Sequence, residues 1–303
     1  MWLVHDLFWQ KPCCLMPMSF PSSRRRSRTS AAMIALSTAG LIGTAGAFGA
    51  CRDGEQPAMA ETTAAEAPSG PRTPGYGFDV VAEYPHDPKA FTQGLLWHDG
   101  KLFESTGQVG QSNIREVSLT SGKVVRQQDL EEPHFGEGIV ILGETLYQIT
   151  WTSGKAFTYD WKTFKRTGEF SYDGEGWGLT TDGTSLIMSN GSNTLIYRDP
   201  KTFTAQKAIT VTDRGNQVSQ LNELEWVKGE IWANVWQKDS IARIDPATGN
   251  VTGWIDLVGI LPTLDRAGNE DVLNGIAYHP TTDKIYVTGK LWPKLYEIRL
   301  KAR

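Results

Sequence analysis

The chain has 303 residues, of which 40% are apolar, 21% are charged and 31 are glycine, a composition typical of a folded domain with many turns. Its 30 Lys and Arg stand against 34 Asp and Glu, which gives a formal net charge of −4. This balance argues against the basic face that a nucleic-acid surface needs, so we expect no nucleic-acid partner.

Residues 1–60 have the features of a targeting segment. Four arginines between positions 24 and 28 form a positive region, and an apolar run rich in Gly and Ala follows over 31–50. Ala58 and Ala60 then form an A-x-A cleavage site. We therefore predict a signal peptide and export to the periplasm or out of the cell.

Two alternatives to cleavage after Ala60 stay open. Cys51 ends a stretch that resembles a lipobox, so the exported protein could be a membrane-attached lipoprotein with a lipid on Cys51. The apolar run could also remain as an uncleaved membrane anchor. We interpret residues 1–17 as an extension upstream of the true start. No cysteine follows Cys51, so the rest of the chain has no disulfides or thiolate metal sites.

The composition changes twice more before the end of the chain. Residues 61–75 are rich in Ala, Thr, Glu, Pro and Gly and cannot bury a core, so we predict a disordered linker. Residues 76–303 should form one folded domain that carries the activity.

One pattern repeats five times in this domain. A segment such as FTQGL leads, after a short turn, into a second apolar-alternating run, and the aligned residues are Gly94, Gly138, Gly178, Glu223 and Gly275. Their spacings are 44, 40, 45 and 52 residues. Periods near 40–45 residues with strand-length alternation are typical of propeller blades of four strands each. The sequence therefore predicts an all-β fold, a five-bladed β-propeller.

The two ends of the domain indicate how the ring closes. The fifth copy ends at 294–300 without a fourth strand, whereas the strand-like segment 78–84 precedes the first copy and has no blade of its own. Pairing this N-terminal strand with the last blade would close the ring and remove an exposed edge. The alternative is an open solenoid of the same units.

The first strand of each blade lines the central channel, and its first residues lie at one mouth. The residues just before the aligned positions are polar or carry an indole: Gln93, Glu137, Trp177, Asn222 and Asn274. The ends of the second strands add Glu104, Trp151, Asn190, Asn234, Trp236, Lys290 and Trp292. This mixture predicts a pocket for a small polar group between aromatic walls. Taken singly, each residue could instead belong to the propeller core.

Other chemistries find little support. The chain has no G-x-S-x-G elbow, P-loop, G-x-G-x-x-G or H-E-x-x-H motif. We interpret His86, His98, His134 and His279 as turn or surface residues, because they fall at unmatched positions of the repeat. We therefore expect no catalytic metal and no cofactor, although oxygen ligands could still hold a structural calcium ion.

Several longer strings resemble a known family. YPHDPKAFTQGLLW, FGEGI, GEGWGL, LNELEW with IWANVWQ, and LNGIAY with VTGKLWPKLYEI are similar to the plant and bacterial glutamine cyclotransferase family over essentially all of 78–300. The resemblance implies a five-bladed propeller. It also implies an acyltransferase that converts the N-terminal glutamine of peptides or proteins into pyroglutamate, with release of ammonia and without a catalytic metal. We expect a monomer.

The resemblance also implies a set of site residues. The family's positions fall on Glu137 and on Phe91, Gln93, Phe135, Trp151, Trp177, Asn222, Trp236 and Lys290. The eight residues other than Glu137 should bind the substrate. Gln93, Asn222, Lys290 and the indole N–H groups are candidates to hold the γ-amide and the developing oxyanion. Asn190 departs from the family, where Asp is at least as frequent.

The implied reaction needs one proton carrier. The free α-amine of a terminal Gln attacks its own γ-carboxamide, so orientation supplies much of the acceleration. One carboxyl group can take a proton from the amine and give one to the departing ammonia. We assign this general acid/base role to Glu137, whose pKa the aromatic neighbours should raise by desolvation. Glu104 and Glu223 are the rivals.

Two interpretations from other classes stay open. The ring could bind peptide N-termini without catalysis, or it could be a calcium-dependent propeller lactonase or hydrolase. The second requires a central cluster of carboxylates and Asn, whereas the aligned channel positions offer one carboxylate, Glu137, with Glu104 and Glu223 nearby in the sequence.

Overall fold

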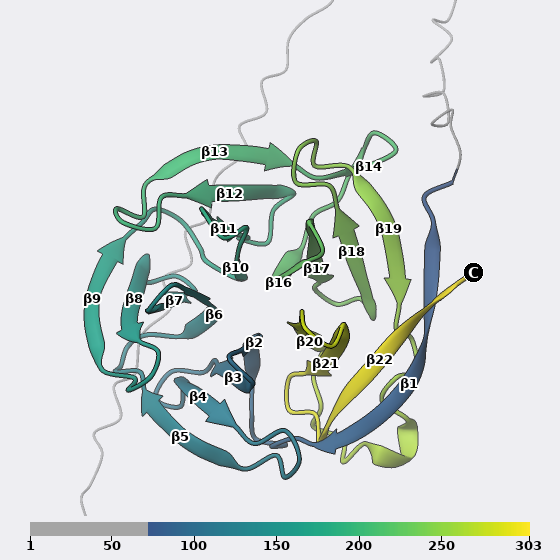
Figure 1. Ribbon diagram of the computed structural model, residues 1–303, viewed down its shortest axis with the longest axis horizontal. Helices are drawn as coiled ribbons and strands as arrows, with labels where there is room; N and C mark the ends of the chain where they lie inside the picture. The colour runs from purple at the N-terminus through teal and green to yellow at the C-terminus, as the bar shows by residue number, and fades with distance from the viewer. Residues whose placement is uncertain (1–71) are drawn as a thin grey trace, which may run out of the picture. The chain divides into compact units, whose positions relative to one another are not determined.

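Strands make up nearly all the regular structure of residues 72–303, the part of the chain that the computed structural model describes (Figure 1). The one helix among these residues is a 3-10 turn, Thr263–Asp265. The all-β prediction is therefore confirmed.

Most strands belong to antiparallel units of four that follow each other along the chain. The first unit is β2 (Thr92–His98), β3 (Lys101–Thr106), β4 (Asn113–Val117) and β5 (Val124–Asp129). The second is β6 (Gly136–Leu142), β7 (Thr145–Thr150), β8 (Lys155–Asp160) and β9 (Arg166–Ser171). The third is β10 (Leu179–Thr181), β11 (Leu186–Met188), β12 (Thr194–Arg198) and β13 (Ala205–Thr210).

The last two units are joined in one eight-stranded sheet, in the order β16-β17-β18-β19-β1-β22-β21-β20. The fourth unit is β16 (Leu221–Val227), β17 (Glu230–Val235), β18 (Ser240–Ile244) and β19 (Val251–Asp256). The fifth is β20 (Leu273–His279), β21 (Lys284–Gly289), β22 (Lys294–Ala302) and the N-terminal strand β1 (Gly75–Pro85). A small ribbon of β14 (Thr212–Asp213) and β15 (Asn216–Gln217) precedes the fourth unit.

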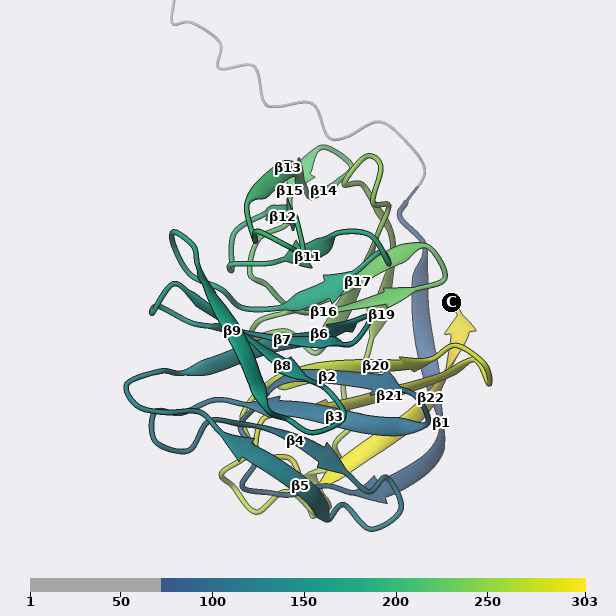
Figure 2. The same ribbon diagram turned by 60° about the vertical axis from the view of Figure 1, so that its left-hand side comes forward.

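The N-terminal strand completes the fifth unit, as predicted. β1 pairs antiparallel with β22 from Tyr76↔Ala302 to Pro85↔Lys294. Its first residues also pair parallel with β19, at Gly75↔Trp254. Figure 2 shows β1 and β22, the first and last strands of the described residues, side by side.

The units are arranged around a common centre (Figure 1). Their first strands, β2, β6, β10, β16 and β20, lie nearest the middle and contact one another in cyclic order. The outer strands β5, β9 and β13 are largely exposed, whereas the first two strands of each unit are mostly buried.

The hydrophobic core lies between neighbouring units. Successive side chains of a strand point to opposite faces, so each inner strand serves two interfaces. Leu95 packs in a cluster shared with the fifth unit, and Leu96 in one shared with the second. In the same way, Ile139 packs in the cluster shared with the first unit, and Val140 packs in one shared with the third. Full burial of each such side chain contributes roughly 1.5–3 kcal/mol, so the interfaces hold the units in place.

Glycine recurs at the aligned position because the inner strands come very close together there. A Cβ on Gly138 would lie 2.4 Å from the backbone nitrogen of Leu179, and one on Gly178 would lie 2.0 Å from the carbonyl oxygen of Asn222. Only glycine lets adjacent inner strands approach this closely.

The fourth repeat carries Glu223 at this position instead. Its carboxylate accepts hydrogen bonds from the backbone nitrogens of Leu95, at 3.2 Å, and Ile276, at 2.9 Å. Glu223 therefore ties the inner strands of the first, fourth and fifth units together.

The predicted targeting segment 1–60, the lipid site at Cys51 and most of the linker 61–75 lie outside the described residues. Gly75, the last residue of that linker, is already the first residue of β1, and the two residues before it contact distant parts of the chain. Thr73 donates a hydrogen bond to Asp213, and the carbonyl of Pro74 accepts one from Trp254 at 2.9 Å. Between residues 72 and 303, no helix has the length and apolar character needed to cross a membrane.

Candidate active site

One cavity of about 360 Å³ contains all nine site residues expected from the sequence. Its lining consists of Phe91, Gln93, Phe135, Glu137, Trp151, Trp177, Asn222, Trp236, Lys290 and one residue not anticipated, Asp271. These side chains come from all five units, so the cavity exists only in the assembled ring.

β-Bulges help to place the polar residues. Near the start of β2, β6, β16 and β20, the pairing with the next strand shifts register, and the shifts contain Gln93, Glu137, Asn222 and Asn274. A bulged residue leaves the regular ladder and its side chain is redirected. Gln93, Glu137 and Asn222 thereby line the cavity. Asn274 does not line it, because its amide donates to the Thr92 carbonyl and to Gln93 Oε1, at 3.0 and 3.2 Å. It therefore orients Gln93.

Glu137 is a buried carboxyl group with few partners. It is 4% exposed, and Gln93 Nε2 donates to its Oε1 over 3.1 Å. No other hydrogen bond from residues 72–303 reaches this carboxylate. Burial raises the pKa of Glu137 well above its ordinary value, the charge of Lys290 partly opposes this, and the charge of Glu175 adds to it. The group is therefore suited to take up and release a proton.

Lys290 brings the cavity's one ammonium group. It is 5% exposed, and its Nζ lies 4.9 Å from the centre of the Phe91 ring. Burial lowers the pKa of Lys290, while the charges of Glu137 and Asp271 oppose that shift. A positive charge in this place can stabilise an oxygen that becomes negative during a reaction.

The aromatic wall is built from interlocking rings. Phe135 packs edge to face against Phe91 and against Trp151, with centroid distances of 6.1 and 5.8 Å. Trp177 and Trp236 form a further T-shaped pair at 5.7 Å. Such contacts hold the rings in fixed orientations and keep one side of the cavity apolar.

Glu175, which the sequence analysis did not single out, fixes two of these indoles. Its Oε2 accepts the N–H of Trp151 at 2.8 Å and the N–H of Trp177 at 2.9 Å. The indole N–H groups were candidates to hold the γ-amide and the developing oxyanion, but in this structure those of Trp151 and Trp177 donate to the exposed Glu175 carboxylate instead. A signal for Glu175 did exist: it stands three residues before Gly178, as Phe91 and Phe135 stand before their glycines.

Asn222 offers the cavity an unused acceptor. Its side chain is 3% exposed, and its Oδ1 is buried without a hydrogen-bond partner among the described residues. A buried carbonyl oxygen without a partner costs on the order of 1–3 kcal/mol, so the site favours a ligand that brings an N–H group to this atom.

The two rival carboxylates lie outside the cavity. Glu104 accepts hydrogen bonds from His86, Thr92 and Arg115. Glu223 accepts the two backbone N–H groups described above. Neither carboxylate lines the cavity.

Three other residues predicted at the channel mouth also serve the structure. The Asn190 side chain accepts from Ser192 within a turn, and Asn234 accepts from the backbone nitrogen of Gly275. Trp292 is buried in the core between the fourth and fifth units. Alternation in a strand could not distinguish these structural positions from positions that line the cavity.

The interpretation of His86 as a turn or surface residue is wrong. The ring is buried, because it bonds to Glu104 and to the Trp292 carbonyl. Within residues 72–303, no group of three or more His, Cys, Asp or Glu side chains is arranged to hold a metal ion.

Comparison with known proteins places these features in context. A family model described as glutamine cyclotransferase matches residues 55–300. A glutaminyl-peptide cyclotransferase of Arabidopsis thaliana is 47% identical over 227 residues, which cover 74% of this chain and 71% of the relative. The crystal structure of Myxococcus xanthus glutaminyl cyclase is 40% identical and aligns with a TM-score of 0.73, covering 77% of this chain and 100% of that one.

Proposed function

The chain belongs to the glutamine cyclotransferase family and catalyses glutamine cyclisation, and we propose that its substrate is the N-terminal glutamine of a peptide or protein, with Glu137 as the proton carrier. The observation that carries this proposal is the state of Glu137. It is a buried carboxyl group in an aromatic cavity, held by a single hydrogen bond, with a pKa raised mainly by burial.

The reaction balances with this one group. The α-amine nitrogen attacks the γ-carbonyl carbon and forms the new C–N bond, while the carbonyl oxygen gains negative charge. The Glu137 carboxylate accepts the proton that the amine loses. It then gives that proton to the γ-nitrogen as the old C–N bond breaks, so ammonia leaves and the carboxylate is regenerated. A pKa raised toward the working pH suits both transfers.

The remaining lining residues would orient the substrate. The Asn222 Oδ1 can accept an N–H of the α-amine or of the γ-amide, and Lys290 can stabilise the developing oxyanion. Gln93 is held by Asn274, so it can direct Glu137 toward the amine. Trp151, Trp177 and Trp236 would enclose the side-chain methylenes and exclude water, with Phe91 and Phe135 behind them. Because the reaction is intramolecular, this orientation contributes much of the rate.

We propose in addition that the ring is a five-bladed β-propeller. Four-stranded units whose inner strands contact in cyclic order, and the completion of the last unit by β1, support this. We further propose that the reaction needs no metal or other cofactor, since the steps above use only side chains of this chain. From the sequence features of residues 1–60 we propose export, with a monomeric ring as the active form.

The direct test is mass spectrometry of a short peptide that begins with Gln, incubated with the purified protein. The proposal predicts loss of ammonia from this peptide, in the presence or absence of EDTA. The matched control is the same peptide with an acetylated N-terminus, which lacks a nucleophilic amine and should not react. Binding without loss of ammonia would favour a non-catalytic ring, and activity that disappears in EDTA and returns with calcium would favour a calcium-dependent enzyme.

A further inference from the structure

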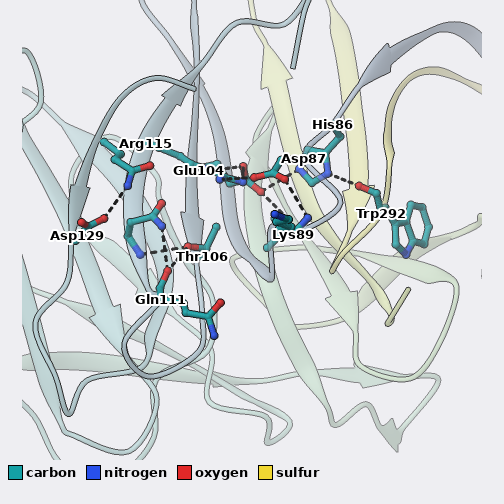
Figure 3. A network of polar contacts seen from close by, with 12 residues as sticks. His86, Asp87, Lys89, Glu104, Thr106, Gln111, Arg115, Asp129 and Trp292 are labelled. Atoms are coloured by element: carbon teal, nitrogen blue, oxygen red, sulfur yellow. Dashed lines mark hydrogen bonds and ion pairs between the residues drawn. The ribbon is translucent and has the colours of Figure 1, made fainter. Parts of the chain in front are cut away.

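A buried network of charges lies outside the cavity, between the first and fifth units (Figure 3). At its centre is Glu104, which is 1% exposed. Its carboxylate accepts from Thr92 Oγ1 at 2.6 Å, His86 Nε2 at 3.0 Å and Arg115 Nε at 2.8 Å. Arg115 also pairs with Asp87, at 3.0 Å. No step of the cyclisation uses any of these groups.

The geometry defines the charge of His86. Its Nε2 lies 3.0 Å from the Glu104 carboxylate, and its Nδ1 lies 2.7 Å from the carbonyl oxygen of Trp292. Both partners can only accept when Glu104 is ionised, so the ring makes both bonds only with a proton on each nitrogen. Burial and the charge of Arg115 both act to lower the pKa of His86, but Glu104 and the Trp292 carbonyl outweigh them and raise it. The arrangement therefore fits an imidazolium between two acceptors.

The network is connected to the cavity through the turn that carries Lys290. Besides the bond from the His86 ring to Trp292, the His86 backbone nitrogen donates to the Pro293 carbonyl at 2.9 Å. Leu291 donates to the Ala90 carbonyl at 2.7 Å and has a positive φ of 61°. A left-handed leucine is strained, so surrounding bonds must hold this turn in place.

We infer that His86 is a positioning residue for Lys290. Clamped between Glu104 and the Trp292 carbonyl, the imidazolium fixes the turn after β21 and so holds the Lys290 ammonium over Phe91 in the cavity. This inference rests on the role proposed above for Lys290. A purely structural role would make a His86 substitution lower turnover whether or not Lys290 is present. The inference predicts instead that the substitution lowers turnover only when Lys290 is present.

A double-mutant cycle tests this coupling. We expect His86→Gln, which can still donate one hydrogen bond but carries no charge, to lower kcat by about 10–100-fold, because small displacements of a reacting group have effects of this order. In a Lys290→Met background, the same change should lower kcat no further. Glu116→Gln is the control, because this largely buried carboxylate of the same unit pairs with Lys101 and Arg126 instead. We expect its kcat to equal that of the wild type.

Each outcome has a definite meaning. Equal fractional losses of kcat from His86→Gln in both backgrounds would overturn the inference but leave the proposed function intact. A wild-type kcat in Lys290→Met would overturn the proposed role of Lys290 itself, and the inference with it.

Nitrogen-15 NMR of histidine-labelled wild-type protein gives a second measurement that depends on no variant. We expect one of the five histidines to carry protons on both ring nitrogens at pH 7. If all of them are neutral tautomers at that pH, His86 is not the imidazolium that the inference requires, and the inference is wrong.

Discussion

Glu104 on β3 and Glu137 on β6 belong to neighbouring units and are almost equally buried, at 1% and 4% exposure, yet their surroundings are opposite. Glu104 faces the Arg115 guanidinium, the His86 ring and the Thr92 hydroxyl. Glu137 faces aromatic rings and accepts one hydrogen bond, from Gln93. Burial depth alone therefore does not set the protonation state of a carboxyl group; the donors and charges around it also do.

The charge states follow from this difference. Burial by itself would raise the pKa of Glu104, but Arg115 and His86 outweigh it and lower the pKa to about 2. At Glu137 burial prevails, and the pKa is raised. Glu104 is thus a permanent anion that holds structure together, whereas Glu137 can exchange its proton during a reaction.

The largest effect should come from Glu137→Gln. This change keeps the size of the side chain and removes the proton carrier, so kcat should fall by about 10²–10⁴-fold while substrate binding persists. Steady-state kinetics and calorimetric titration with a slowly reacting Gln peptide would measure the two quantities. If Glu137→Gln turns over normally while Glu104→Gln or Glu223→Gln abolishes turnover, the assignment of the proton carrier is wrong.

Glu104→Gln should instead lower the stability of the fold. It leaves Arg115 and His86 without their carboxylate, and breaking a buried ion pair in this way costs about 3–5 kcal/mol of unfolding free energy. Urea denaturation at pH 7 would measure this loss, and Glu137→Gln is the matched control, expected to be much less destabilised. Equal stability of the two variants would contradict the comparison.

The pH dependence of the unfolding free energy also tests whether the ionised Glu104 stabilises the fold. The pKa of Glu104 is lowered in the folded state from 4.5 to about 2, so its stabilisation is present above pH 4.5 and lost as the pH falls toward 2. The wild type should therefore lose stability over this range more steeply than Glu104→Gln does. Parallel curves for the two proteins would show that Glu104 gives no such contribution.

A smaller effect is expected from Glu175→Gln. Burial is the main cause of the raised pKa of Glu137, and the negative charge of Glu175 adds to it. Removing that charge should move the acid limb of kcat/KM to lower pH and change kcat at neutral pH only a few-fold. Glu169→Gln, which removes an exposed carboxylate of the same unit that pairs with Lys155, should leave the profile unchanged. A limb that moves to higher pH would contradict the electrostatic argument.

Much of the fold could be predicted from the sequence, because the repeat has local causes. Strand alternation distributes Leu95 and Leu96 between two interfaces. The aligned glycines are needed because the inner strands approach each other too closely for a Cβ atom. The missing fourth strand of the last copy indicated where β1 pairs. The contacts of Thr73 and Pro74 could not be predicted, since they join these residues to Asp213 and Trp254, which are distant in the sequence.

The lining of the cavity was predictable where one position of the repeat faces it in four of the five units, and less so elsewhere; Asn274, at this position in the fifth unit, does not line the cavity. Gln93, Glu137 and Asn222 share that position. Glu104 and His86 were misjudged because their partners come from other strands and from the turn after β21, which alternation does not reveal. Whether a polar residue serves the cavity or the structure depends on such partners.

The central claim is that Glu137 alone carries the proton, and one titration tests it most directly. Infrared difference spectroscopy can follow the C=O band of a buried protonated carboxyl group in the wild type and in Glu137→Gln as the pH is raised. We predict a band that is absent from Glu137→Gln, with a midpoint above the ordinary Glu pKa that coincides with the acid limb of kcat/KM. Burial also raises the pKa of Glu223 and of Glu225, so bands from these groups should remain in both proteins. If Glu137→Gln removes no band whose midpoint coincides with the acid limb, the proton belongs to another group and the account is contradicted.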